Sequence, residues 1–457
     1  MRPKPASHAD AWKRLRSSDN LRAAWQHIYS NGIKSASAET KDQVKRFVST
    51  SGSALTNISR KLHADRYRFE PARGIPIKKA GGRGKRGIVL FRIEDRIVQR
   101  AILNVVQAIP AIQAKLNAGL NFGGIAGGDF GVPAAVQHAL VGCQQQRYFI
   151  RTDVRKFFDQ IPRDRALDAL CAHIDDERLA RLLRSAANVE LANLEHLPED
   201  ERRLFPLGNE GVAQGSCLSP LICNFLLAPL DEQMTGQGVT WVRYIDDIVL
   251  FADSRRRAHA ALRSAQRQLR ELGLDAYDPA DDPGKAEDGH TRTETLTFLG
   301  CEIQPARVRP SSVNRRKLLA RVKGISENAL AGLAGARIGV GDRPTVAGAI
   351  MEIRRTVQGW GNTYCFCTDD DLMRDMDRLI AECVDDFLKR AQQRLKRMDT
   401  MQRLRSMGWV PLVECKKDGE DERCRALVSS FRSSNAGRQH PGLSLNSTPC
   451  LEIPTPR

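Results

Sequence analysis

The sequence predicts an α+β fold in which helical segments surround antiparallel strands. Short apolar runs alternate with basic residues over residues 67–90, around a glycine-rich centre, and this pattern is typical of a β-hairpin. Residues 239–250 are apolar on both sides of Asp246-Asp247, which predicts two strands joined by a tight turn. Apolar residues recur with helical spacing over residues 93–108, so this segment should be a helix.

The other elements follow in chain order. Residues 8–30 predict two helices separated near Ser17–Asn20, and residues 41–62 predict a helix broken near residues 51–53. A strand should end at Asp153 and precede a helical region that reaches about residue 195. We expect a further strand over residues 295–303, a basic helical region over 312–400, and a loose tail over 431–457.

Composition restricts the class of protein. The 457 residues are 41% apolar and 27% charged, a globular balance that excludes wholesale disorder. The mean hydropathy of −0.40 and the lack of a long uncharged apolar run predict no membrane span, and the N-terminus shows no secretory signal. The 11 cysteines lack Cys-x-x-Cys spacing, so we expect reduced thiols and a cytoplasmic protein.

The charge balance predicts the kind of partner. A net charge of +17 is typical of proteins that bind a polyanion, most simply a nucleic acid. A solvated basic surface without a partner is the alternative, and composition does not separate the two.

Three carboxylates on predicted strands are the strongest chemical feature. Asp153 closes one apolar strand, and Asp246-Asp247 lie at the tip of the predicted 239–250 hairpin. Carboxylates on a buried sheet are costly unless they are paired or bind metal, and three of them suit two Mg²⁺ ions in nucleotidyl transfer. Alternatively, Asp-Asp is an ordinary turn dipeptide and Asp153 caps the next helix.

Several segments resemble, in the same order, the motifs of reverse transcriptases related to group II intron-encoded proteins. Together they lie within about residues 15–390. The matching segments are Asn20-Leu21 to Asn31-Gly32, Tyr67 to Lys79, Lys85 to Gln99, Arg151-Thr-Asp-Val-Arg-Lys-Phe-Phe-Asp159, Gln214-Gly-Ser-Cys-Leu-Ser-Pro220, Tyr244-Ile-Asp-Asp247, Gly284-Lys285 and Phe298 to Cys301.

This resemblance implies a right-hand polymerase with an antiparallel palm sheet, basic fingers and a helical thumb. It divides the chain into a helical N-terminal extension (1–59), fingers (60–147), a palm (148–308) with an insertion at about 181–207, a helical thumb or maturase-like region (309–400) and a partly flexible C-terminal extension (401–457).

The resemblance also implies roles for particular residues. Asp153, Asp246, Asp247 and the backbone of Val154 would hold two Mg²⁺ ions, with Mn²⁺ as the alternative. Lys85, Arg86, Phe158, Gln214 and Lys285 would bind the incoming dNTP, with Phe158 excluding a 2′-OH. Gly215, Phe298, Leu299, Gly300, Trp360 and Tyr364 would contact primer or template. Structural roles remain the alternatives: a core aromatic for Phe158, a solvated hairpin for Lys85 and Arg86, an ordinary turn for Gln214-Gly215, and a packed strand for Phe298–Gly300.

Two departures refine the expectation. Residues 123–129 are glycine-rich where group II relatives often have a basic segment, and no His-Asn-His-type endonuclease pattern appears. The chain therefore looks most like free-standing bacterial reverse transcriptases, many of which act in phage defence with a non-coding RNA. We expect an RNA-directed DNA polymerase that copies an RNA template into DNA from dNTPs and has no membrane partner. The sequence does not predict the oligomeric state.

Three other functions stay open. The chain could be a group II intron maturase whose main role is RNA binding, a template-independent DNA polymerase, or an inactive RNA-binding scaffold. The presence of all three aspartates disfavours the last of these.

Overall fold

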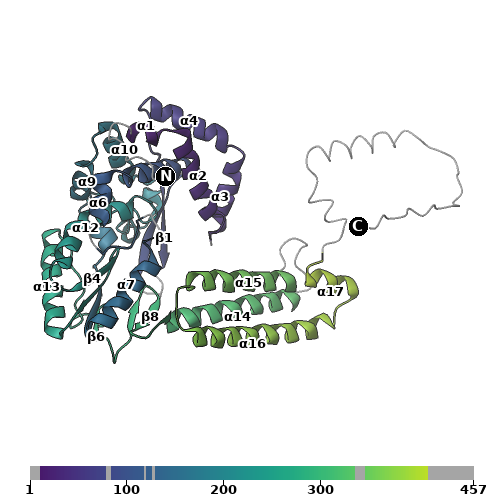
Figure 1. Ribbon diagram of the computed structural model, residues 1–457. Helices are drawn as coiled ribbons and strands as arrows, with labels where there is room; N and C mark the ends of the chain where they lie inside the picture. The colour runs from purple at the N-terminus through teal and green to yellow at the C-terminus, as the bar shows by residue number, and fades with distance from the viewer. Residues whose placement is uncertain are drawn as a thin grey trace, which may run out of the picture. The chain divides into compact units, whose positions relative to one another are not determined.

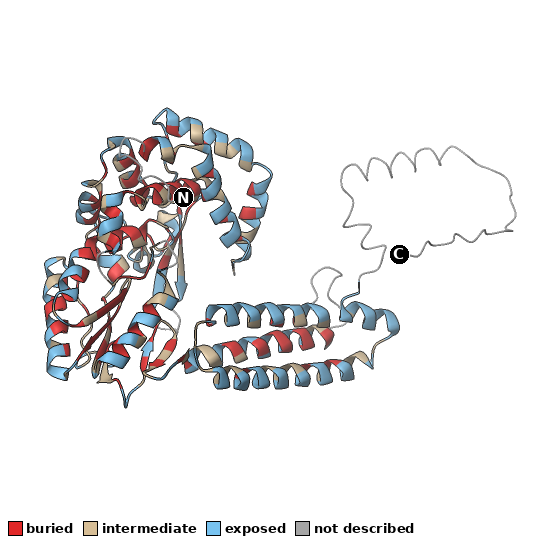
Figure 2. Cartoon of the chain, in the orientation of Figure 1, coloured by how far each residue is buried: buried red, intermediate tan, exposed pale blue. Residues whose placement is uncertain are grey.

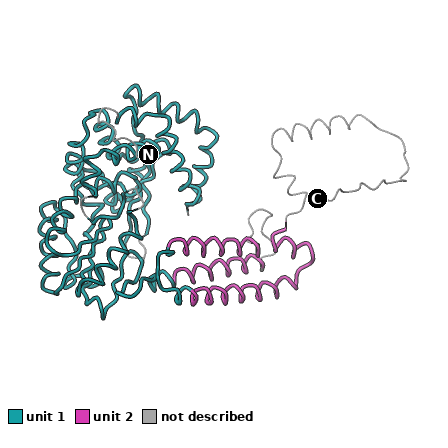
Figure 3. Tube along the Cα trace, in the orientation of Figure 1, with its two compact units in different colours: residues 1–315, 364–373 teal, residues 316–363, 374–457 magenta. Residues whose placement is uncertain are grey.

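The computed structural model describes residues 11–35, 37–78, 84–117, 120–125, 129–334 and 345–409. The chain forms two compact units, which Figure 3 distinguishes by colour. Unit 1 comprises Met1–Arg315 and Tyr364–Met373, and unit 2 comprises Arg316–Thr363 and Arg374–Arg457. The expected tail over 431–457 lies outside the described residues.

Unit 1 begins with four helices: α1 (Ala11–Leu15), α2 (Ser18–Gly32), α3 (Ala38–Val48) and α4 (Ser51–His63). The break expected near Ser17–Asn20 is confirmed, because Ser17 caps α2 by accepting a hydrogen bond from the Asn20 N–H over 3.2 Å. Leu21, Ala24 and Ile28 are buried at three- and four-residue spacing, and α2 packs against α5 (Ile93–Val106).

The basic hairpin is present as β1 (Arg73–Lys78) and β2 (Lys85–Leu90), which pair antiparallel from Arg73↔Leu90 to Lys78↔Lys85. Most of the residues that join the two strands lie outside the described residues. Helices α5, α6 (Pro110–Asn117) and α7 (Val132–Gln145) follow, and α5 is buried along most of its length. Figure 2 shows the buried residues of the described chain in red.

A four-stranded sheet forms the centre of unit 1. Its strands are β3 (Tyr148–Asp153), β4 (Thr240–Tyr244), β5 (Asp247–Ala252) and β6 (Glu287–His290), in the order β4-β5-β3-β6. Every pairing is antiparallel (Figure 1). The α+β fold class with antiparallel sheet is therefore confirmed. The strand–turn–strand expected over 239–250 is present as β4 and β5.

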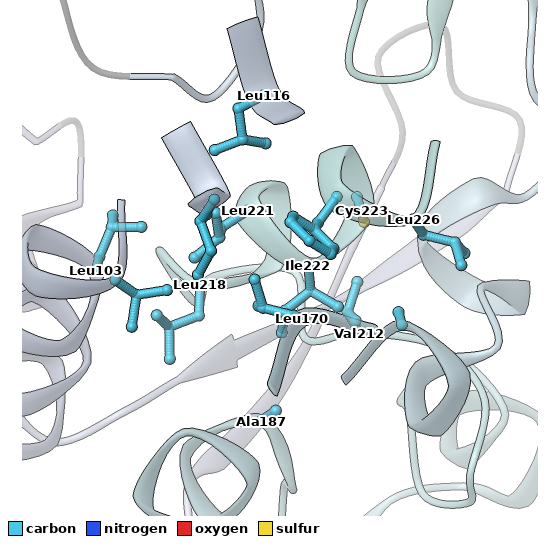
Figure 4. Packing of buried hydrophobic residues seen from close by; sticks show 14 of the residues in the cluster. Leu103, Leu116, Leu170, Ala187, Val212, Leu218, Leu221, Ile222, Cys223 and Leu226 are labelled. Carbon is cyan, nitrogen blue, oxygen red and sulfur yellow. The ribbon is translucent and has the colours of Figure 1, made fainter. Parts of the chain in front are cut away.

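Helices around this sheet supply the main core. They include α9 (Arg163–Cys171), α10 (Glu177–Ala187), α12 (Ser219–Thr235) and α13 (Arg255–Glu271). Figure 4 shows part of this core: Leu170 of α9, Leu218 just before α12 and Ile222 of α12 belong to the same hydrophobic cluster. Burial of this apolar surface, at about 25 cal/mol per Å², is the main force that holds the sheet and helices together. Short helices α8 (Phe157–Gln160), η2 (Leu194–His196) and α11 (Glu199–Arg202) complete the region.

One sequence prediction is wrong at the end of unit 1. Residues 295–303 were expected to form a single strand, but the structure has β7 (Leu296–Phe298) and β8 (Cys301–Gln304) with a tight turn between them. Leu299 and Gly300 both have positive φ angles, of 49° and 79°, which reverses the chain. β9 (Arg307–Pro310) pairs with β8 and completes this three-stranded sheet.

Unit 2 is helical, as expected for this region. It contains most of α14 (Ser312–Ala334) and α16 (Asp370–Leu395), together with α15 (Val346–Thr363) and α17 (Thr400–Met407). The unit has its own core, which includes Val322, Leu330 and Phe387. None of the helices in the described residues combines the length and apolar character that a membrane crossing requires.

Candidate active site

Three carboxylates meet where β3 ends and β5 begins. Asp153 is the last residue of β3 and pairs directly with Asp247, the first residue of β5. Asp246 lies in the two-residue turn between β4 and β5. The Val154 N–H donates to the Asp246 carbonyl over 3.2 Å and so ties the end of β3 to this turn. The structure thus brings together all three predicted aspartates and Val154.

The environment of these carboxylates disfavours three negative charges. Burial, and then the charges of Asp246 and Asp247, raise the pKa of Asp153 to about 7. Burial, and then the charge of Asp246, raise the pKa of Asp247 to about 6, and burial raises the pKa of Asp246 as well. Such a like-charged cluster shares protons unless a cation compensates it.

Lys285 is one of the cations near this cluster. Its charge acts to lower the pKa of Asp153 and of Asp247, against the larger effect of burial. Its Nζ lies 5.8 Å from the centroid of the Tyr277 ring, and the Arg155 guanidinium lies 4.2 Å from the same ring. Arg155 also pairs with Asp282, so this acidic residue of the loop is neutralised by Arg155 and not by Lys285.

The two predicted phosphate-binding residues on β2 have different surroundings. Lys85 forms an ion pair with Glu201, which raises the pKa of the exposed ammonium group. Arg86 is also exposed, and its charge acts on Asp246 to lower that carboxyl's pKa. Successive residues of a strand point to opposite faces, which explains the difference. Arg86 is therefore the better placed of the two to meet a ligand at the carboxylates.

Phe158 lies at the edge of the core and is half-buried. Its ring meets that of Phe157 edge-on, with centroids 5.8 Å apart and an interplanar angle of 75°. Its carbonyl accepts a hydrogen bond from the Val212 N–H over 2.8 Å, which fixes the backbone. Phe157, by contrast, is fully buried, so the core role falls mainly to Phe157 and part of the Phe158 ring stays accessible.

Gln214 and Gly215 connect β2 to the segment that carries Phe158. The Gln214 carbonyl accepts from the Val89 N–H over 2.8 Å, and its Nε2 donates to Asp159 Oδ1 over 3.3 Å. Gly215 has a φ of +131°, and a Cβ there would collide with the Val89 carbonyl oxygen. Only glycine allows this close approach of two backbones.

The Leu299-Gly300 turn is held by the chain that follows it. The Gly300 carbonyl accepts hydrogen bonds from the Ser311 N–H at 2.9 Å and from Asn314 Nδ2 at 3.1 Å. Asn314 Nδ2 also donates to the Tyr364 hydroxyl at 2.7 Å. Phe298 is buried beneath the turn, which leaves Leu299 and Gly300 partly exposed at its tip.

The two aromatic residues expected to contact nucleic acid lie in different units. Tyr364 is only 8% exposed and supports the Leu299-Gly300 turn through Asn314, so its ring offers no free face for a base. The expectation of stacking on Tyr364 is corrected accordingly. Trp360 lies in unit 2, where it is half-buried against the helical core.

A family model described as reverse transcriptase (RNA-dependent DNA polymerase) matches residues 77–302, the segment that contains these carboxylates. The chain carries a reverse transcriptase domain. Its sequence is similar to intron proteins, in agreement with the expected group II-like relationship.

The relatives match this chain over a limited length, and the chain spans less than half the length of each of them. The "uncharacterized 91 kDa protein in cob intron" of Schizosaccharomyces pombe is 29% identical over 178 residues, which is 39% of this chain and 20% of that protein. The "putative COX1/OXI3 intron 2 protein" of Saccharomyces cerevisiae is 25% identical over 40% of this chain and 20% of its own length. "Protein YkfC" of Escherichia coli is 27% identical over 38% of this chain and 43% of its own length.

Two solved structures align with part of this chain. A partial Cas6-RT-Cas1–Cas2 complex aligns with a TM-score of 0.31 and 21% identity, over 56% of this chain and 41% of that one. The apo telomerase of Candida tropicalis aligns with a TM-score of 0.39 and 12% identity, over 71% of this chain and 64% of that one.

The carboxylates of the reverse transcriptase domain fit a divalent metal ion. Asp153 Oδ1 is buried without a hydrogen-bond partner, and carboxylate oxygens are the ligands that Mg²⁺ and Mn²⁺ prefer. Within the residues that the structure describes, no three His, Cys, Asp or Glu side chains already stand in a metal-binding arrangement.

Sequence reasoning missed some residues that shape the site. Arg155 and Tyr277 organise the loop that carries Lys285, and Arg243 lies directly beneath the Asp246 turn. Arg155 and Arg243 are each two or three residues from a predicted catalytic aspartate, which is the one signal that could have singled them out. Tyr277 stands in a segment without a recognisable pattern.

Proposed function

We propose that this chain is an RNA-directed DNA polymerase that extends a DNA primer on an RNA template with two Mg²⁺ ions, or Mn²⁺ in their place. The observation that carries the proposal is the direct pairing of Asp153 with Asp247, beside Asp246, where β3 ends and β5 begins. This cluster lies inside the segment that matches the reverse transcriptase family.

In the proposed reaction, the primer 3′-OH attacks the α-phosphate of a dNTP and pyrophosphate leaves. Divalent ions at Asp153, Asp246 and Asp247 supply charge neutralisation and activation of the 3′-OH. The chain's own residues do the positioning. Arg86 and Lys285 are two of the cations whose charges act on the carboxylates, and both could bind the triphosphate oxygens with charge-assisted hydrogen bonds.

In the proposal, the other predicted site residues surround the 3′ end of the growing primer. The accessible part of the Phe158 ring would lie under the sugar and exclude a 2′-OH. Gln214-Gly215 would present a flat backbone to the new base pair, and the exposed Leu299-Gly300 tip would contact the primer. In this proposal residues 60–147 are the fingers, 148–308 the palm with the insertion at about 181–207, and 309–400 the thumb.

A primer-extension assay tests the proposal. Purified wild-type protein should extend a DNA primer on an RNA template when Mg²⁺ is present, and Asp153→Asn or Asp246→Asn should abolish extension while RNA binding persists. Asp253→Asn is the matched control, because Asp253 lies just beyond the other end of β5 in an exposed pair with Arg257. Full activity in Asp246→Asn would overturn the assignment.

A second function has support from the relatives. The three fungal relatives are all named as intron proteins, which favours a maturase that binds and helps to splice an intron RNA. Such a protein would promote splicing in the Asp246→Asn variant as well as in the wild type. A splicing assay on RNA from the flanking genomic region therefore separates the two functions, and products that ignore template sequence would instead indicate a template-independent polymerase.

For the biological role, we propose phage defence with a dedicated non-coding RNA as the template. The support is the resemblance to free-standing bacterial reverse transcriptases and the net charge of +17. Cells that carry the intact locus should resist phage, and cells with the Asp246→Asn variant should not. Equal plaque counts in both would contradict this role and leave the polymerase assignment in place.

A further inference from the structure

A buried ion pair lies beneath the turn that carries Asp246. The side chain of Arg243 on β4 is 0% exposed and that of Asp231 on α12 is 3% exposed. Arg243 Nε donates to Asp231 Oδ1 over 2.8 Å, and its Nη2 donates to Asp231 Oδ2. The two parallel hydrogen bonds hold the guanidinium in a single orientation.

The third nitrogen of Arg243 points toward the active site. Nη1 donates to the Ile245 carbonyl over 2.8 Å and to Asn224 Oδ1 over 2.9 Å. Because the Ile245 carbonyl belongs to the peptide unit that leads into Asp246, this hydrogen bond holds the backbone of the turn at the residue before the carboxylate.

That backbone needs support. Ile245 has a φ of 61°, and a β-branched residue in this left-handed region is a genuine outlier. Strained conformations of this kind persist only when the surrounding structure determines them. The Arg243 hydrogen bond is one such determinant, since it satisfies the Ile245 carbonyl in its strained position.

The glycine-rich segment that contains Gly123 contacts the same turn from another side. The Phe122 N–H donates to the Arg243 carbonyl over 2.9 Å, and Asn224 Nδ2 donates to the Gly123 carbonyl over 2.5 Å. A Cβ at Gly123 would lie 2.6 Å from Ile245 Cγ1 and 2.8 Å from Ile245 N. Glycine therefore lets this segment press directly against the turn.

A purely structural ion pair is the simpler explanation. However, a buried ion pair is weak evidence for stability, since apolar residues of similar size often stabilise a core as well or better. Here one guanidinium nitrogen also donates a hydrogen bond to the Ile245 carbonyl, which adjoins Asp246, and no apolar pair could make this contact. The charge of Arg243 also favours the ionised form of Asp246.

We propose that Arg243, oriented by Asp231, is a positioning residue that fixes the Ile245-Asp246 turn and thereby sets the Asp246 carboxylate for metal binding. This inference rests on the proposed function and extends it to a pair of residues that never touches the substrate. Gly123 and Asn224 belong to the same support.

The test uses the double variant Arg243→Gln/Asp231→Asn in the full chain, which leaves no unpaired buried charge and keeps an acceptor for the Trp241 indole N–H. Mn²⁺ binding, measured with Mn²⁺ alone by its electron paramagnetic resonance signal, should weaken by about tenfold to a hundredfold. The kcat of primer extension should fall by about a hundredfold, while RNA binding and the KM for RNA stay unchanged. Arg243→Lys keeps the positive charge but loses the planar guanidinium that makes two parallel hydrogen bonds. Its Mn²⁺ affinity and its kcat should lie between those of the wild type and the double variant.

The control is Asp95→Asn, which alters another buried carboxylate of the same unit, one that accepts from the Tyr67 hydroxyl over 2.8 Å. It should lower the thermal unfolding temperature without changing Mn²⁺ affinity. If the double variant binds Mn²⁺ as tightly as the wild type and retains its kcat, the ion pair is only structural and the proposal is overturned. If the wild-type protein shows neither Mn²⁺ binding nor polymerase activity, the proposed function is contradicted instead. The Mn²⁺ measurement separates the two failures because it needs no turnover.

Discussion

Asp153 and Asp247 are directly opposite each other on adjacent antiparallel strands, so two carboxylates that are far apart in the sequence become cross-strand neighbours. Like charges in this relationship are destabilising, because paired Cβ atoms lie only about 4.5–5.5 Å apart. Repulsion between these two carboxylates therefore destabilises the sheet where β3 ends and β5 begins, and a divalent cation would remove this repulsion. This relationship leads to the first prediction.

The metal-free protein should lose stability as pH rises from about 4 to about 8. The pKa of Asp153 is raised to about 7 and that of Asp247 to about 6, so the folded state holds protons that the unfolded state releases near pH 4. A carboxyl group whose pKa is raised in the folded state stabilises the fold at low pH, and this stabilisation is lost as pH rises through the window. The unfolding temperature, measured from pH 5 to pH 8, should therefore fall by a few degrees because of these groups.

The control for this prediction is Asp153→Asn, which should flatten the pH dependence because it removes the group with the higher pKa of the two. Mg²⁺ should raise the unfolding temperature of the wild type at pH 8 and have little effect at pH 5. An identical pH dependence in the variant and the wild type would show that other groups control stability.

Shrinking the Phe158 side chain should relax the choice of sugar. Phe158→Val or Phe158→Ala should raise the use of rNTPs relative to dNTPs by more than about tenfold, as removal of a steric block should. The measurement is the ratio of kcat/KM values for matched rNTP and dNTP substrates. Phe157→Leu is the control, because Phe157 is buried in the core and should change stability without changing this ratio. An unchanged ratio in the Phe158 variants would place the gate elsewhere.

Arg86 and Lys85 should differ in their effect on the nucleotide. Arg86→Gln should raise the KM for dNTP by about tenfold or more, as the loss of a charge-assisted contact to phosphate does. Lys85→Gln should have a smaller effect, because the Lys85 ammonium is already engaged by Glu201. Steady-state kinetics at fixed RNA–primer concentration measure both. Equal effects would mean that Lys85 leaves Glu201 when the nucleotide binds.

RNA bound to the purified protein should separate into two classes on a salt wash. Each phosphate neutralised on a single strand adds about 0.7 to the slope of log affinity against log salt, so generic RNA should dissociate steeply. Contacts by shape and base stacking are much less sensitive, so one structured RNA should remain at about 0.5 M salt, where screening is strong.

Sequencing of the RNA retained after the wash decides the outcome. A single enriched species supports a dedicated template, and the Asp246→Asn variant should retain the same species because binding does not need catalysis. A mixture of cellular RNAs would favour a general polymerase, and an enriched intron would favour the maturase function.

Local sequence pattern predicted those parts of the fold that local forces determine. Helix α5 and strands β3, β4 and β5 followed from apolar periodicity, and the Asp246 turn followed from polar residues between apolar runs. The prediction failed over residues 295–303, because an apolar run contains a reversal at Leu299, a residue that rarely adopts positive φ. Nothing in the apolar pattern marks that turn.

Which side chains meet was decided by the tertiary structure. The order of motifs implied that Asp153 and Asp246 are close, but only strand register makes Asp247 the direct partner of Asp153. Likewise, adjacent residues Lys85 and Arg86 look equivalent in the sequence, and the pleat of β2 gives them different neighbours.

The clearest division lies beneath the site. The sequence alone determined that three aspartates stand at strand ends or in the turn between two strands, since carboxylates at the ends of apolar runs are visible as a local pattern. Only the tertiary structure decided that Arg243 of β4 and Asp231 of α12 form a buried pair that holds the Ile245 carbonyl. The physical reason is that a salt bridge depends on the distance between two groups in space, and helix packing against the sheet sets that distance.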